Sequence, residues 1–182
     1  MKTLLITILA VSFLLSCNKD DDKPIAEIDK LPPATQTGAN TAGCLVNGEA
    51  FLPKGNVQGG NLVLNYFGTD FTFKIAQKRL NEPLKSIGII LEQLEAPLEI
   101  NQLIILNTEI ETLPTRTGIY MFDGTPPPSP LFHQTTPHIK GELLITHHDF
   151  DNAILSGTFW FDAINSEGEI VEIREGRFDV QY

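Results

Sequence analysis

The densest group of metal-binding residue types begins at His147 and reads His-His-Asp-Phe-Asp-Asn. Imidazole groups bind zinc, and regularly spaced carboxylates bind calcium. Adjacent residues of a strand point to opposite faces, so His147 and His148 are poorly placed to share one ion. The acids also lack the spacing of a calcium loop, because Ile154 stands where that loop needs glycine. We expect a solvated strand end and turn here, and we assign no metal ligand and no cofactor.

The chain contains none of the short catalytic patterns His-Glu-x-x-His, Gly-x-Ser-x-Gly or the Walker loop. A cysteine becomes a nucleophile when a nearby base or cation favours its thiolate. Cys44 lies in a Gly-Cys-Leu-Val context without such a neighbour. We therefore expect Cys44 to pack in the core, and we assign no catalytic residue.

Acidic and basic residues alternate near the C-terminus, at Glu167, Glu169, Glu172, Arg174, Glu175 and Arg177. Such carboxylates could hold a cation, or two of them could form the acid pair of a glycosidase, roughly 5 to 9 Å apart across a cleft. On a hairpin with alternating faces they fit an outward row with cross-strand ion pairs, which is the interpretation we prefer.

Trp160 is the only tryptophan of the chain and our candidate binding residue. Strand alternation places it opposite Phe159 and Phe161, on the face that Thr158 and Asp162 share. An exposed indole on a sheet can stack on a sugar ring or a peptide. The alternative is burial under a loop or a second layer, and a blue-shifted emission that resists a quencher would identify that case.

The N-terminal residues indicate an export signal. Lys2 precedes an apolar run over residues 4–15, which is 12 residues long. A membrane span needs about 20 residues to cross a ~30 Å hydrocarbon layer. We therefore interpret residues 1–16 as a signal peptide.

The four residues that end at Cys17, Leu-Leu-Ser-Cys, resemble the lipobox of bacterial lipoproteins. The resemblance implies that the Cys17 sulfur carries a diacylglyceryl thioether and that cleavage after Ser16 creates an amine for further acylation. Several acyl chains would hold the protein permanently on a membrane. Cys44 is the only other cysteine, so a lipidated Cys17 leaves no intramolecular disulfide. An ordinary secretory signal with a cysteine at its boundary is the alternative.

Residues 17–40 predict a lipidated, flexible tether, because proline, aspartate, threonine and glycine are frequent and no periodicity is visible. Asn18 is not the aspartate associated with retention in the inner membrane, which favours the outer membrane. The residues behind it resemble the signal that exports some Gram-negative lipoproteins to the cell surface, or they only solvate the tether; they are Lys19, Asp20, Asp21 and Asp22. The side of the membrane that the protein faces stays open.

The composition indicates one globular domain over residues 41–182, since 42% of the residues are hydrophobic and 20% are charged. The 23 acidic and 13 basic side chains give a formal charge of -10. Such an acidic protein has no cationic surface to hold a phosphate backbone, so we do not expect nucleic acid as a partner.

Short apolar or alternating runs separated by Gly, Pro, Asn and Asp predict an all-β domain, an antiparallel sandwich or barrel of about 8–10 strands. Prolines predict a long loop over residues 124–137. The hairpin around residues 165–168 has the clearest alternation. The expected strands are residues 44–46, 50–53, 61–67, 71–77, 84–92, 99–106, 118–122, 138–147, 154–164 and 169–180.

Four segments together resemble a family of uncharacterised exported lipoproteins of the Bacteroidetes type. They are Gly-Cys-Leu-Val-Asn-Gly at 43–48, Gly-Glu-Leu-Leu-Ile-Thr at 141–146, Ser-Gly-Thr-Phe-Trp-Phe-Asp-Ala at 156–163 and Glu-Gly-Arg-Phe-Asp-Val at 175–180. The resemblance implies a β-rich exported domain and no particular activity. The only functional residue it implies is the acylated Cys17.

These features favour an envelope lipoprotein that acts as a non-catalytic binding or structural module, lipid-anchored in the outer membrane and potentially displayed at the cell surface. Its expected partners are the membrane, through the acyl chains on Cys17, and a glycan or an envelope protein. Two alternatives stay open. One is a hydrolase whose carboxylates come together in the fold, and the other is a carrier of a small ligand in an apolar cavity.

Overall fold

The computed structural model describes residues 24–123 and 131–182, and the all-β class is confirmed in this part of the chain. The predicted signal peptide, Cys17 and the run Lys19 to Asp22 lie outside the described residues. The described elements are the 3-10 helix η2 (Glu27–Lys30) and eleven strands. The strands are β1 (Thr41–Val46), β2 (Glu49–Phe51), β3 (Leu62–Phe67), β4 (Asp70–Gln77), β5 (Leu84–Glu92), β6 (Leu103–Leu106), β7 (Thr115–Asp123), β8 (Leu131–Gln134), β9 (Gly141–Asp149), β10 (Ile154–Ile164) and β11 (Ile170–Gln181).

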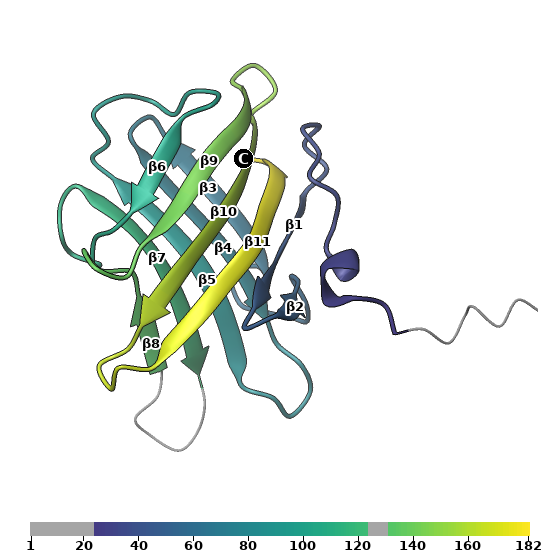
Figure 1. The fold of residues 1–182 in the computed structure, drawn as a ribbon. Helices are drawn as coiled ribbons and strands as arrows, with labels where there is room; N and C mark the ends of the chain where they lie inside the picture. The colour runs from purple at the N-terminus through teal and green to yellow at the C-terminus, as the bar shows by residue number, and fades with distance from the viewer. Residues whose placement is uncertain (1–23, 124–130) are drawn as a thin grey trace, which may run out of the picture.

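All eleven strands pair antiparallel in a single sheet, which curls into a half-barrel (Figure 1). The strand order is β2-β1-β11-β10-β8-β7-β5-β4-β3, and β6 and β9 lie off this path. β10 is the branch point, because its first eight residues pair with β9 while Ile164 at its end pairs with Gln134 of β8. β9 in turn carries β6. The strands β6, β9, β10 and β11 therefore form a continuous wing of the sheet.

Phenylalanine rings fill the centre of the half-barrel. The ring centroids of Phe73 lie 4.8 Å from Phe178 and 5.6 Å from Phe159, and Phe159 lies 6.4 Å from Phe161. Glycines face these rings: Gly157 pairs with Phe178 and Gly176 pairs with Phe159 across β10 and β11. A Cβ atom on Gly176 would collide with the Phe159 ring. The space between these strands is thus packed by side chains.

The prediction for the last hairpin is confirmed. Phe159, Phe161 and Ala163 of β10 are buried, and the returning strand β11 buries Ile173 and Phe178 on the same inner side. The alternation of apolar residues was sufficient here because one face meets the core and the other meets solvent.

The prediction of a continuous loop over residues 124–137 is wrong for β8, and residues 124–130 lie outside the described part. The segment Leu131–Gln134 contains no proline, so its backbone can donate to a sheet. It pairs with β7 at four positions, from Ile119↔Gln134 to Phe122↔Leu131. The prolines around this segment predict a loop from composition alone. Pairing with β7 makes the segment a strand instead.

The flexible tether predicted up to residue 40 does not hold for residues 27–40, which we call the docked segment. Glu27 accepts a hydrogen bond from the Ala50 amide of β2, and Leu31 is buried. Further along, the side chain of Asp179 on β11 accepts hydrogen bonds from Thr35 Oγ1 at 2.6 Å and from the amides of Thr37, Gly38 and Ala39 at 2.8 to 3.2 Å. The docked segment therefore covers part of the outer face of the sheet.

Asp179 is 1% exposed, and Ser156 of β10 donates a further hydrogen bond to it at 2.9 Å. Burial alone would raise the pKa of this carboxyl group. The hydrogen bonds from Thr35, Thr37, Ala39 and Gly38 outweigh burial and hold the pKa far below its ordinary value. Asp179 is therefore a buried but fully partnered carboxylate that attaches the docked segment to β11.

None of the helices in the described ranges, 24–123 and 131–182, is long and apolar enough to cross a membrane.

Candidate functional site

The outer face of β6, β9, β10 and β11 carries the candidate site. Cross-strand register places Leu103, Leu144 and Thr158 in one outward row, which ends at Arg177 of β11. A second row joins Ile105, Glu142 and Trp160. Leu103 is 53% exposed and Trp160 is 37% exposed. The indole of Trp160 is therefore partly exposed and is not buried under a loop or a second layer of the described residues.

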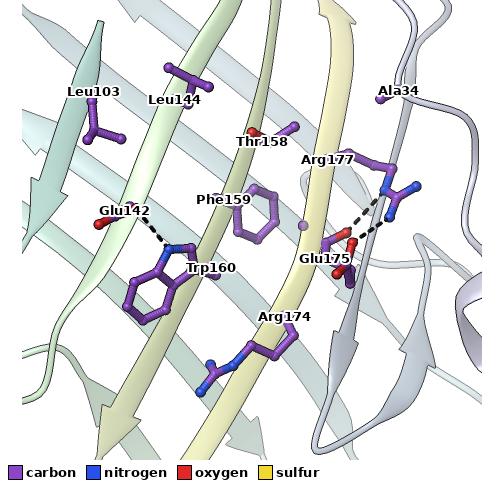
Figure 2. A pocket seen from close by; sticks show the side chains of 11 residues that line it. Ala34, Leu103, Glu142, Leu144, Thr158, Phe159, Trp160, Arg174, Glu175 and Arg177 are labelled. Atoms are coloured by element: carbon purple, nitrogen blue, oxygen red, sulfur yellow. Dashed lines mark hydrogen bonds and ion pairs between the residues drawn. The ribbon is translucent and has the colours of Figure 1, made fainter.

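The Trp160 indole is held in one orientation by its neighbours. Its Nε1 donates a hydrogen bond to Glu142 Oε2 at 3.0 Å, and the Arg174 guanidinium lies over the ring at 5.5 Å from its centroid. Figure 2 shows the indole between these two side chains, with Leu103 and Leu144 on the far side of Glu142. An aromatic side chain fixed in this way loses little conformational entropy when a ligand stacks on it.

The Arg174 guanidinium is in turn fixed from below. Its Nη1 donates hydrogen bonds to the carbonyl oxygens of Ile173 at 2.9 Å and Phe161 at 3.2 Å. The same nitrogen lies 2.7 Å from Asp162 Oδ1, as an ion pair rather than an aligned hydrogen bond. This cross-strand pair agrees with the predicted outward row of charges. These acceptors hold the Arg174 guanidinium in place, and 37% of the Arg174 side chain stays exposed to solvent.

A second ion pair lies on β11 beyond a bulge. Arg177 Nη2 lies 3.3 Å from Glu175 Oε2, and Arg177 Nε donates to the Glu175 carbonyl at 3.1 Å. The register of β10 and β11 shifts between Phe159 and Phe161, and Glu175 has a positive φ of 54°. A bulge of this kind inserts an extra residue and bends the strand. It places Arg174 and Glu175 both opposite Trp160.

These side chains surround an open groove of about 620 Å³, which lies within the range of about 300 to 1,000 Å³ typical of small-molecule sites. We call it the Trp160 groove. It crosses four strands and reaches the docked segment at Ala34. It is lined by Ala34, Leu103, Glu142, Leu144, Thr158, Phe159, Trp160, Arg174, Glu175, Gly176 and Arg177.

The lining of the Trp160 groove contains two carboxylates that could take part in acid–base chemistry, Glu142 and Glu175. Its two carboxylates are engaged, since Glu142 accepts the indole N–H and Glu175 pairs with Arg177. A glycosidase needs one carboxyl group in an apolar setting that keeps it protonated, and half of the Glu175 side chain is open to solvent. Cys44 lies in the core as predicted, fully buried, and burial raises the pKa of its thiol.

The polar cluster at His147 forms a strand end and turn, as predicted. Asp149 Oδ1 accepts the amides of Asp151 and Asn152 at 3.0 Å each. His148 is buried, and its ring nitrogens lie 2.9 Å from the Leu98 carbonyl and 3.1 Å from the Tyr182 hydroxyl. In the part of the chain that the structure describes, no three His, Cys, Asp or Glu side chains come together to hold a metal ion.

His133 of β8 is a buried polar residue that the sequence did not single out. It is 4% exposed, and its Nδ1 has no hydrogen-bond partner among the described residues. Its ring packs edge-on against Tyr120 at 5.6 Å between centroids. Burial lowers the pKa of His133, and the charge of Glu169 opposes this effect only in part.

Sequence reasoning named Trp160, Thr158 and the charged residues of the last strand, but it missed the residues of β6 and β9 that complete the Trp160 groove. Glu142 lies 18 positions away and Leu103 belongs to another strand, so only the pairing of β6, β9 and β10 brings them together. The one local signal was the alternation of β9, where Glu142 and Leu144 face outward and Leu143 faces the core.

Comparison with known proteins gives no match for this chain among family models, curated proteins or solved structures.

Proposed function

We propose that this chain is a lipoprotein of the outer membrane, anchored through acyl chains on Cys17, and that it acts as a non-catalytic module binding its ligand in the Trp160 groove. The observation that carries the binding role is the 37% exposed indole of Trp160, held between Glu142 and Arg174. An exposed indole whose N–H is bonded to a carboxylate and whose ring carries a guanidinium is held in place before a ligand arrives.

The anchor rests on the sequence alone. The apolar run of residues 4–15, the small residue Ser16 and the thiol of Cys17 support acylation and cleavage at this point. Lys19 and the acids behind it support export to the outer membrane. Two or more acyl chains would give stable attachment, where a single chain gives only marginal binding.

The binding role can be tested by oxidative footprinting of the full-length protein in detergent, read by mass spectrometry. Solubilised envelope material from the producing cells should lower oxidation of Trp160. Phe150, which is exposed at the turn between β9 and β10, serves as an internal control and should not change. Equal oxidation of Trp160 with and without the envelope material would contradict the binding role, and newly released reducing ends would favour the hydrolase.

The anchor can be tested by labelling cells with radioactive palmitate. The wild-type protein should incorporate the label and partition into detergent, whereas Cys17→Ala should do neither. Equal labelling of both proteins would contradict acylation at Cys17. Protease treatment of intact and lysed cells would then show which side of the outer membrane the domain faces.

A further inference from the structure

We infer that the Trp160 groove binds a segment of a neutral polysaccharide, with one pyranose ring stacked on the Trp160 indole. This inference rests on the proposed function, because it names the ligand class of the same site. The inference follows from the charges of the Trp160 groove, from its dimensions and from the residues that flank the indole.

Positive and negative side chains are equal in number in the lining of the Trp160 groove. The side chains that line the Trp160 groove include two guanidinium groups, Arg174 and Arg177, and two carboxylates, Glu142 and Glu175. The whole chain has a formal charge of -10, which repels anionic ligands over long distances. A neutral ligand suffers no such repulsion. Its hydroxyl groups can donate to the carboxylates and accept from the guanidinium groups, so one ligand satisfies both kinds of partner.

The dimensions fit a chain of rings better than a single ring. The Trp160 groove crosses β6, β9, β10 and β11, and three spacings of about 4.8 Å give a width of about 14 Å. Leu103 and Leu144 lie on one side of the indole, and the ion pair of Arg177 and Glu175 lies on the other. Apolar C–H faces and polar edges alternate in a sugar chain in the same way.

The glutamate beside the indole disfavours a protein partner. Glutamate is depleted in protein interfaces, because removing water from its charge is costly unless it finds a matched partner. Glu142 and Arg174 directly flank the indole, at the point where such an interface would need to be dry. Sugar hydroxyls can replace the water molecules around both groups, and a sugar-binding site remains partly wet.

Trp160 is the only tryptophan, so its fluorescence reports on this site alone. The test titrates the full-length protein in detergent with cellohexaose, laminarihexaose, xylohexaose and mannohexaose. At least one should change the emission with saturation, and the corresponding monosaccharide should bind more weakly. Calorimetry should show at least about a 10-fold loss of affinity in Trp160→Ala, a change worth about 1.4 kcal/mol. Trp160→Phe should recover part of it, and Phe150→Ala should bind as the wild type does.

The footprint with envelope material separates this inference from the proposed function. Periodate cleaves the vicinal diols of sugars, which internal residues of 1,4-linked chains carry and those of 1,3-linked chains lack. Material treated with periodate should therefore no longer protect Trp160 if the chain is 1,4-linked. Material that was digested with a protease, which is then inactivated, should still protect it. Protection that survives periodate and is lost after proteolysis would overturn the sugar ligand and leave the binding role intact. Binding only of an acidic polysaccharide, such as polygalacturonate, would overturn the neutral class. Absence of protection by untreated material would overturn both.

Discussion

The outer face of the sheet has two halves that differ in what lies on them. Over β1, β11 and the start of β10, the docked segment covers the sheet, and the buried Asp179 receives hydrogen bonds from Thr35 to Ala39 and from Ser156. Over β6, most of β9 and the rest of β10 the described residues leave the face more open, since Gln36 of the docked segment reaches β9 only at the Thr146 carbonyl, and Trp160 and Leu103 stay exposed.

The difference between the two halves separates structural from ligand-binding polar residues. In the covered half, the chain itself supplies every partner, so nothing remains for a ligand. In the uncovered half, the ion pairs and the Glu142 hydrogen bond orient the indole and leave a surface open to solvent. We place the proposed ligand on this half because the partly exposed indole lines an open groove there.

The largest effect is expected in the covered half. Asp179→Ala would leave several buried amides and hydroxyls without an acceptor, at about 1 to 3 kcal/mol for each unsatisfied group. We expect a loss of about 3 kcal/mol or more in the free energy of unfolding, measured by chemical denaturation. Asp179→Asn keeps one acceptor oxygen and should lose less. Wild-type stability of Asp179→Ala would show that the docked segment is not attached through this carboxylate.

A smaller loss in the free energy of unfolding is expected from a change in the core, on the inner side of the uncovered half. Gly176→Ala would place a methyl group against the Phe159 ring, and overpacking of this kind costs about 1 to 3 kcal/mol. Phe159→Leu in the same chain should relieve part of this cost, as a double-mutant cycle would show. Strict additivity of the two changes would mean that Gly176 and Phe159 do not constrain each other.

A buried group inside the half-barrel gives a third test, through pH. His133 has a lowered pKa in the folded protein, so the unfolded chain binds its proton more readily. Stability is then complete above about pH 6.5 and falls as the pH drops below that value. Asp179 behaves differently, because its carboxylate loses its contribution only below about pH 4.

Thermal unfolding between pH 7 and pH 5 checks the histidine effect. His133→Phe removes the titrating ring and the unpartnered Nδ1, so the variant should lose less stability on acidification than the wild type. His138, His147 and His148 are present in both proteins, so their contributions cancel in the comparison. The same pH dependence in both proteins would exclude His133 as the source.

The smallest effect on stability is expected at the binding residue itself. Trp160→Ala removes one hydrogen bond and one cation–π contact at a partly exposed position, which together cost about 1 kcal/mol. Its unfolding midpoint should stay close to that of the wild type while ligand affinity falls. A loss as large as that of Asp179→Ala would show that Trp160 is primarily structural and would remove the contrast between the two halves.

The strands with strong local patterns were predictable from the sequence. The segments 84–92 and 154–164 were expected with the bounds that β5 and β10 show, because long apolar or alternating runs allow few other structures. β8 was missed, since its four residues depend on pairing with β7 and β10 rather than on their own pattern.

The candidate site was predictable on the last hairpin alone, at Trp160 and in the outward charges of Arg174, Glu175 and Arg177. The docked segment was misread for a related reason. Its polar composition resembles a linker, and its stability depends on Asp179, which lies 144 positions from Thr35 in the chain. A local sequence pattern cannot predict a contact between residues so far apart in the chain. The same is true of the strand pairing that forms the Trp160 groove.

The attachment at Glu27 also limits how far the domain can stand from a lipid surface. If residues 18–40 were all free, the 23 residues could span about 75 Å. With the chain held from Glu27 onward, only Asn18 to Ala26 separate it from the proposed acylated cysteine, and nine residues reach at most about 30 Å. The proposed anchor would therefore hold the domain close to the lipid surface. Any polymer that binds in the Trp160 groove must then pass close to the membrane.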